Sequence, residues 1–290
     1  MTGQGSGRPG GTVGLLSDLA ASVCLSLALV AGSAACSAQP QPVLQPANQP
    51  PHPPPLLAVI TWNVHAGRGD LPRLVDDLTQ GRLTGAPIRN YVILLQETIK
   101  GNQYDVAAFA RERQLWAYFA PVRESDVGTS GNAILTTEPP LEARTIVLPR
   151  IRRMRKAVEA TFEIEGRSMF IVNAHLENRR HWLKGGVFAD RARGVQTRAL
   201  IDALPPGPGI VGGDLNTVLG PDEPTVRMLS ERFADNPMQP LVPTFHDRLV
   251  LDHLFFDLPD GWVATRQVIA NRYDSDHHPV LGLVFAGRLS

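Results

Sequence analysis

The sequence predicts an α/β domain in which mixed β-sheets carry helices on their outer faces. From Leu56 onward, segments with helical spacing of apolar residues alternate with short apolar runs typical of strands. Four predicted strands follow one another between residues 131 and 174, which a simple parallel barrel would not contain. The stretch from Leu56 to Ser290 is long enough to bury the core of one large domain.

The individual elements follow from the positions of apolar residues and of turn formers. Apolar, β-branched runs predict buried strands at 56–63 and 91–96, and apolar spacing predicts helices at 70–80 and 105–115. The four central strands are predicted at 131–136, 143–148, 157–164 and 168–174, with a hairpin at Glu165-Gly166. Later helices are predicted at 187–204 and 224–233, and later strands at 210–212, 251–256, 262–268 and 280–285.

The first 55 residues have a different composition, which indicates an export segment and a spacer. Residues 1–38 contain an apolar run at 20–31 that is shorter than the roughly 20 residues a membrane helix needs. Small residues and then Cys36 follow, and this arrangement resembles a bacterial lipoprotein signal, although Ser33 stands where that signal usually has Leu. The resemblance implies a lipid anchor at Cys36 in the cell envelope. Plain cleavage and secretion, or a retained anchor, are the alternatives.

The remaining organisation is a spacer at 39–55, rich in proline, and one large folded domain at 56–290. The formal net charge is zero, which argues against a dedicated high-affinity nucleic-acid binder but allows a locally positive cleft. Both cysteines, Cys24 and Cys36, precede the domain, so it has neither a disulfide framework nor a cysteine metal site.

Polar residues gather at the ends of the predicted strands, where α/β proteins usually build their sites. Taken singly these residues are weak signals, since a Glu after a strand is usually a solvated cap and Gly-Asp-Leu-Asn is also a turn sequence. The set consists of Asn63, Glu97, His175, Asp214, Asn216, Asp252, Asp276 and His277.

The order of the surrounding motifs is more specific. They are TWNVH at 61–65, LQET at 95–98, NAHL at 173–176, GGDLN at 212–216, LDHL at 251–254 and SDHHP at 275–279. This ordered set resembles the endonuclease/exonuclease/phosphatase superfamily, which includes deoxyribonucleases, AP endonucleases, inositol polyphosphate 5-phosphatases and neutral sphingomyelinases. The resemblance implies a four-layered α/β sandwich, with two mixed β-sheets packed face to face and helices outside. It also implies a divalent-metal-dependent phosphoester hydrolase.

The metal-binding residues are expected among the oxygen donors. Mg²⁺ prefers carboxylate, carbonyl and water oxygens and usually takes one or two protein carboxylates. Glu97 is the best candidate ligand, Asn63 is expected to orient it or complete the shell, and Asp276 is expected on the metal side or behind it. Mn²⁺ would suit the same donors.

The catalytic residues are expected among the remaining members of the set. His277 can accept the proton of the attacking water near neutral pH, and Asp252 would orient its imidazole, as in a Ser-His-Asp triad with water in place of serine. By the resemblance, Asp214 aids proton transfer and Asn216 holds a phosphate oxygen. His175, if protonated, would hydrogen-bond to the phosphate and neutralise it.

Other charged and aromatic residues are expected to be less specific. His65 would line the cleft or remain outside it, His253 is expected to pack, and His246, His278 and His181 are expected to be structural or exposed. Two groups of cations are interpreted as a solvated face or as a phosphate-attracting rim. They are Arg150, Arg152, Arg153, Arg155 and Lys156, and Arg179, Arg180, Lys184, Arg191, Arg193 and Arg198. Trp182 would stack on a base, enter lipid or simply pack.

The predicted function is therefore a monomeric phosphodiesterase with nuclease-like chemistry, acting on nucleic acid, phospholipid or a small phosphate ester. The alternatives are an exported, sphingomyelinase-like lipid phosphodiesterase and a phosphomonoesterase, because one fold serves several substrates. A more remote alternative is an inactive surface-binding lipoprotein, which would predict loss of the catalytic set.

Overall fold

The computed structural model describes residues 54–101, 105–126, 128–178, 187–218, 220–237 and 242–287. The predicted export segment with both cysteines, nearly all of the spacer, His181 and Trp182 lie outside these residues. No helix in the described part of the chain has both the length and the apolar character needed to cross a bilayer.

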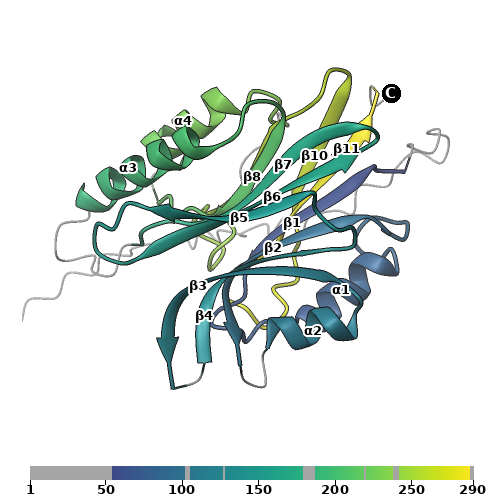
Figure 1. Ribbon diagram of the computed structural model, residues 1–290, viewed down its shortest axis with the longest axis horizontal. Coiled ribbons are helices and arrows are strands. Elements are labelled where there is room, and N and C mark those ends of the chain that lie inside the picture. The colour runs from purple at the N-terminus through teal and green to yellow at the C-terminus, as the bar shows by residue number, and fades with distance from the viewer. Residues whose placement is uncertain are drawn as a thin grey trace, which may run out of the picture. The chain divides into compact units, whose positions relative to one another are not determined.

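Two mixed β-sheets form the centre of the fold (Figure 1). The first sheet has the strand order β10 (Trp262–Val268), β11 (Val280–Ala286), β1 (Leu57–Asn63), β2 (Tyr91–Lys100), β4 (Gly128–Thr136) and β3 (Trp116–Ser125). The second has the order β5 (Glu142–Leu148), β6 (Arg155–Ile164), β7 (Arg167–His175), β8 (Gly209–Asp214) and β9 (Asp252–Asp257). The pairs β1–β2 and β7–β8 are parallel, and the other neighbours are antiparallel.

Helices cover the outer faces of both sheets, so the predicted four-layered sandwich is confirmed. Helices α1 (Leu71–Thr79) and α2 (Val106–Glu112) share an apolar core with the first sheet, and α3 (Val187–Ala203) and α4 (Pro224–Arg232) cover the second (Figure 1). A third core lies between the sheets and contains Val59 and Leu94 from the first and Ile171 and Phe256 from the second.

Local chemistry accounts for the helix starts and the central hairpin. Asp70 caps α1 by accepting a hydrogen bond from the backbone N of Arg73, at 3.0 Å, and Asp105 caps α2 through the amides of Ala107 and Ala108. The hairpin between β6 and β7 turns at Glu165 and Gly166, which both have positive φ as a two-residue turn requires.

The expected elements are present with shifts of a few residues, except that the sequence did not predict β3. This strand lies at the edge of its sheet, and much of it is exposed. Its sequence contains Pro121, at which its pairing with β4 becomes irregular. An exposed edge strand lacks the apolar pattern that identifies a buried one.

Candidate active site

Strand register brings three of the predicted site residues side by side in the second sheet. His175 ends β7 and pairs with Asp214 at the end of the parallel strand β8, and Asp214 pairs with Asp252 at the start of the antiparallel strand β9. Gly213 has φ +151°, and a Cβ there would lie 1.8 Å from the carbonyl oxygen of Ala174. Glycine is therefore required beside Asp214 for β8 to approach β7 this closely.

Asn63 joins the first sheet to this row. It ends β1, is almost fully buried, and donates from Nδ2 to Oδ2 of Asp214 at 2.9 Å. Its Oδ1 accepts a hydrogen bond from the backbone N of His65 at 3.0 Å, which fixes the amide orientation. The polar strand ends of the two sheets therefore meet at one edge.

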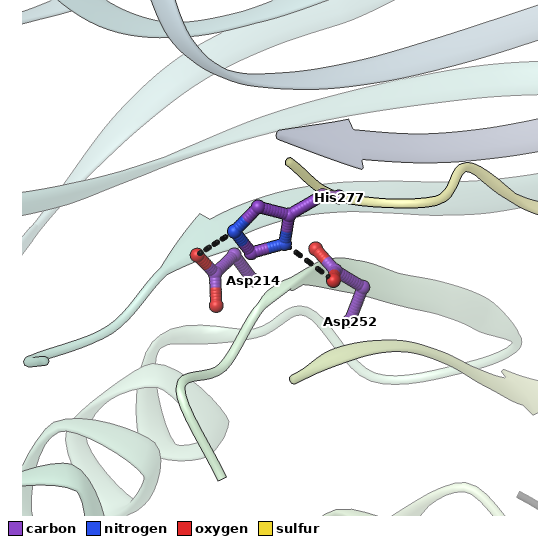
Figure 2. A group of neighbouring side chains, drawn as sticks. All are labelled: Asp214, Asp252 and His277. Atoms are coloured by element: carbon purple, nitrogen blue, oxygen red, sulfur yellow. Dashed lines mark hydrogen bonds and ion pairs between the residues drawn. The ribbon is translucent and has the colours of Figure 1, made fainter. Parts of the chain in front are cut away.

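His277 is buried between two carboxylates (Figure 2). Its Nδ1 donates to Oδ2 of Asp252 at 2.7 Å, and its Nε2 lies 4.0 Å from Oδ2 of Asp214. The backbone around it is fixed, because its amide donates to Ser275 Oγ, whose hydroxyl donates to the carbonyl oxygen of Asn63 at 2.6 Å. The ring of Phe245 packs against the imidazole with the ring centroids 4.7 Å apart.

Glu97 does not follow the end of its strand, as the sequence predicted, but lies within β2 at a bulge. The pairing of β2 with β4 shifts between Leu95 and Thr98, and Glu97 adopts a positive φ of 57°. Bulges of this kind redirect a side chain near functional sites. The Glu97 side chain is half-buried and lines a pocket that it shares with His175.

A buried amide network from the second sheet supports the bulge. Asn173 of β7 donates from Nδ2 to the carbonyl oxygens of Leu95 and Ala133, at 2.8 and 2.7 Å, and accepts a hydrogen bond from Gln96 Nε2 at 2.8 Å. Asn173 therefore binds backbone carbonyl groups of β2 and β4 next to the bulge, and it ties the two sheets together at the site.

Burial and neighbouring charges shift the pKa values of the central groups. Burial opposes the charged form of His277, but the adjacent Asp252 carboxylate, with Asp214 and Asp276, raises its pKa to about 10. Burial raises the pKa of Asp214 to about 7 despite the attraction of His277. Burial, with the positive charges of Arg155 and His277, holds the pKa of His175 well below its usual value. His175 is thus neutral in this environment and can contribute a hydrogen bond rather than a charge to a phosphate.

The remaining predicted residues surround this centre. Oδ1 of Asp276 lies 3.4 Å from Nδ1 of His65 and 4.0 Å from Nε2 of His277, so Asp276 is in contact with both imidazoles. Asn216 has a positive φ of 55°, and its backbone N donates to Oδ1 of Asp214 at 3.0 Å. Its side-chain amide donates to the carbonyl oxygen of Leu176 at 3.2 Å.

Three other predictions are resolved by burial. His253 is buried and hydrogen-bonded to Thr217, in agreement with a packing role, and His278 is buried between the Ile269 carbonyl oxygen and Asp247. The grouping of Arg193 with a solvated or phosphate-attracting cluster is wrong. Arg193 is fully buried and forms an ion pair with Glu223, because α3 packs this face against the segment that precedes α4.

Sequence reasoning missed individual roles for Phe245, Asn173 and Arg155. Phe245 carries no charge, and the sequence marks Asn173 only as part of the NAHL motif. The sequence places Arg155 in a basic run, but Arg155 is only 6% exposed and lies on the pocket that Glu97 lines. Its position at the start of β6, facing inward, is the signal that could have distinguished it from its exposed neighbours.

The donor set suits a magnesium ion at Glu97. Among the described residues, no group hydrogen-bonds to the Glu97 carboxylate, which lines the pocket together with His175. A single carboxylate with water is a usual environment for Mg²⁺. Asp214, Asp252 and His277 also offer ligand atoms within 4.8 Å of one another, but the 2.7 Å hydrogen bond between His277 and Asp252 already occupies two of these groups.

Comparison with known proteins defines the family of the chain. Residues 60–277 match the Endonuclease/Exonuclease/phosphatase family, and the chain belongs to it. Members of this family are metal-dependent hydrolases of phosphoesters. No curated protein matches the sequence.

Solved structures show the same fold at low sequence identity. The human Nocturnin catalytic domain with bound sulfate is 19% identical, with a TM-score of 0.60, over 82% of this chain and 99% of that chain. TDP2 from D. rerio, complexed with single-stranded DNA product, is 20% identical, with a TM-score of 0.53, over 79% and 98%. A double mutant of beta toxin from Staphylococcus aureus, with bound magnesium ions, is 15% identical, with a TM-score of 0.52, over 78% and 98%.

Proposed function

We propose that the protein is a Mg²⁺-dependent phosphodiesterase that cleaves its substrate by attack of water on phosphorus. The hydrogen-bonded pair of His277 and Asp252, beside Asp214 at the edge where Glu97 opens into a pocket, carries this proposal. It provides a base, an orienting carboxylate and a metal ligand in one cluster, which is what water activation at a phosphate needs.

His277 acts as the general base in this scheme. Its Nδ1 is held by Asp252, and its Nε2 points toward Asp214. The pKa of about 10 keeps Nε2 protonated at neutral pH in the absence of a cation, so Nε2 would accept the proton of water once a bound cation has lowered that pKa. Asp252 keeps the correct tautomer and stabilises the imidazolium that forms. A divalent cation held by Glu97, with Asn63 beside it, would supply positive charge for the phosphoryl oxygens and favour the unprotonated base.

Asp214 and its neighbours donate the proton that the leaving oxygen needs and bind the phosphate. With a pKa near 7, Asp214 can exchange a proton close to neutral pH, as a group that serves the leaving oxygen must. Asn63 hydrogen-bonds one of its oxygens and the Asn216 amide the other, so the carboxylate is fixed in place. Neutral His175, 3.5 Å from Asp214, would donate a hydrogen bond to a phosphate oxygen.

Magnesium is proposed on the chemistry of the donors and on one relative. The carboxylate and amide oxygens of Glu97 and Asn63 are the ligand types that Mg²⁺ prefers, and Mn²⁺ shares that preference. The beta toxin of similar fold contains bound magnesium ions.

The proposal is tested by assaying the full chain with Mg²⁺ and with a chelator. The substrates are bis(p-nitrophenyl) phosphate, plasmid DNA, an abasic-site duplex, sphingomyelin and a phosphomonoester. We expect Mg²⁺-dependent hydrolysis of at least one phosphodiester, and we expect Glu97→Ala and His277→Ala each to lower the rate by about 10²-fold or more. Glu163, exposed on β6 and replaced by Ala, is the matched control for Glu97→Ala. Undiminished turnover in both site variants would reject the site.

A further inference from the structure

Arginine side chains concentrate around the pocket beside Glu97. The cavity has a volume of about 590 Å³ and is lined by Arg123, Arg150, Arg152, Arg153 and Arg155, while Glu97 is the acidic residue among its described lining. This volume is within the usual range for small-ligand sites. The chain as a whole is neutral, so this local excess of cations gives the cleft a positive potential.

Arg155 at the floor of the pocket lacks the partners that a buried cation requires. Its side chain is 6% exposed, and its Nε and Nη2 atoms have no hydrogen-bond partner among the described residues. Burial lowers its pKa, although the charges of Glu177 and Asp214 favour its charged form. A buried guanidinium with free donors is costly unless a ligand supplies the acceptors.

The arginine loop, residues 149–154 between β5 and β6, is held in place by two buried side chains. Oε2 of Glu177 accepts hydrogen bonds from the backbone N of Arg152 and of Arg153, at 3.3 and 3.1 Å. Gln196 of α3 donates to the carbonyl oxygen of Pro149 at 3.2 Å and accepts from the backbone N of Glu177 at 2.9 Å. Glu177 and Gln196 are almost completely buried, so the arginine loop is anchored at both ends to the packed core.

We propose that this pocket binds a second phosphate group of the substrate, next to the phosphodiester that is cleaved. Arg155 serves as the buried anchor, and Arg152 and Arg153 on the arginine loop supply the rim contacts. An anchored set of guanidinium groups is a pre-organised phosphate site, because each fork matches two phosphate oxygens. The proposal rests on the proposed function, since it concerns the substrate of that same site.

The inference narrows the substrate class. A phosphodiester flanked by another phosphate is the repeating unit of a nucleotide strand. A choline phosphodiester instead carries a quaternary ammonium, which this pocket would repel. Met154, which is 42% exposed and also lines the pocket, offers an apolar contact for a sugar or base. We therefore assign the arginine pocket to a nucleotide strand.

The kinetic test compares a thymidine dinucleotide with the same dinucleotide carrying an extra phosphate at its 5′ or 3′ end. With Mg²⁺, we expect the extra phosphate at one end to raise kcat/KM by about 10-fold or more, in line with an added charge-assisted contact. In the double variant Arg152→Gln/Arg153→Gln, the ratio of kcat/KM with the extra phosphate to kcat/KM without it should fall toward one. Arg89→Gln is the control, because Arg89 is exposed just before β2, at the end of that strand remote from Glu97. Arg89→Gln should keep the wild-type ratio.

A binding test separates this proposal from the proposed function. Fluorescence anisotropy of a labelled, phosphorylated tetranucleotide is measured in chelator, where no turnover is needed. We expect the loop variant to bind about 10-fold more weakly than the wild type and Arg89→Gln to bind equally well. Two results would overturn the second-phosphate site without affecting the proposed hydrolase activity. One is equal affinity of the Arg152→Gln/Arg153→Gln variant and the wild type. The other is intact hydrolysis by the wild type with the same kcat/KM for the dinucleotides with and without the extra phosphate. Preferential turnover of sphingomyelin vesicles would overturn the nucleotide assignment.

Discussion

Asp214 and Asp252 are neighbouring buried carboxylates at the same register of one sheet, yet they face different partners. Asp252 is hydrogen-bonded to Nδ1 of His277 at 2.7 Å, whereas Asp214 is held by Asn63 and by the Asn216 amide. The nearest oxygen of Asp214 lies 4.0 Å from Nε2 of the same imidazole. The two groups therefore have separable effects on His277 and on proton transfer.

Removing the charge of Asp252 should affect both the base and the rate. In Asp252→Asn we expect kcat to fall by about 10²-fold or more, because the imidazole loses its orienting carboxylate. The pKa of His277, about 10 with Asp252 in place, should fall because its largest source of stabilisation is removed. NMR titration of the imidazole in metal-free protein measures this shift. An unchanged pKa would show that Asp252 does not act on His277.

Neutralising Asp214 should stabilise the protein while it removes activity. Its folded pKa, about 7, lies above the ordinary value of 3.8, so its contribution to stability is fully present below about pH 4 and is lost as pH rises through 7. Asn cannot ionise, so Asp214→Asn should gain thermal stability over the wild type at pH 8 and less at pH 5. Thermal denaturation in chelator at the two pH values checks this. A loss of stability at pH 8 would contradict the burial argument.

At the scale of elements, the bulge in β2 and the amide of Asn173 form one structural unit. The bulge begins after Leu95, and Asn173 reaches from the other sheet to bind the carbonyl oxygens of Leu95 and of Ala133, its partner on β4. The orientation of Glu97 therefore depends on contacts between the two sheets as well as on its own strand.

Removing this amide should destabilise the fold and the site together. Asn173→Leu leaves the carbonyl oxygens of Leu95 and Ala133 without this partner, whereas the Gln96 amide keeps Thr61 and Leu94. Each buried orphan costs about 1–3 kcal/mol, so we expect a loss of about 2 kcal/mol or more. Urea unfolding measures it. Ser168→Ala, exposed near the other end of β7, should change stability by less than about 0.5 kcal/mol. A comparably small effect for Asn173→Leu would show that the network is dispensable.

The elements also show how much of the fold and of the site the sequence could predict. Buried strands such as β1 and β11 were predictable because their apolar runs are local, and the site residues were predictable because most of them end strands. The bulge at Glu97 was not, since it arises from pairing with β4. The burial of Arg193 against Glu223 and the clamp of Glu177 and Gln196 on the arginine loop depend on segments brought together only by the packed fold.

At the scale of the whole fold, the two face-to-face sheets place one set of strand ends at a single edge. β1 and β2 contribute Asn63 and Glu97 from the first sheet, and β7, β8 and β9 contribute His175, Asp214 and Asp252 from the second. A cation held by Glu97 and Asn63 at this edge would occupy a site that only the folded chain assembles, and ligands that bind only the folded state stabilise it.

Magnesium should therefore raise the unfolding temperature of the wild type. At about 100 times its Kd the gain is about 2.7 kcal/mol, and Glu97→Gln should abolish most of it because the carboxylate ligand is lost. Differential scanning fluorimetry across a Mg²⁺ titration measures both proteins. Glu163→Gln, an exposed change on β6, is the control. An equal shift in Glu97→Gln would place the cation elsewhere.

In the proposed site Glu97 holds the cation, whereas His277 and Asp252 form the base. Locating the cation tests this assignment most directly. A crystal soaked in Mn²⁺ should give an anomalous difference peak within about 2.5 Å of a Glu97 carboxylate oxygen, with the hydrogen bond from His277 to Asp252 intact. A peak between Asp214, Asp252 and His277, with that hydrogen bond broken, would contradict the account, because the proposed base would then be a metal ligand.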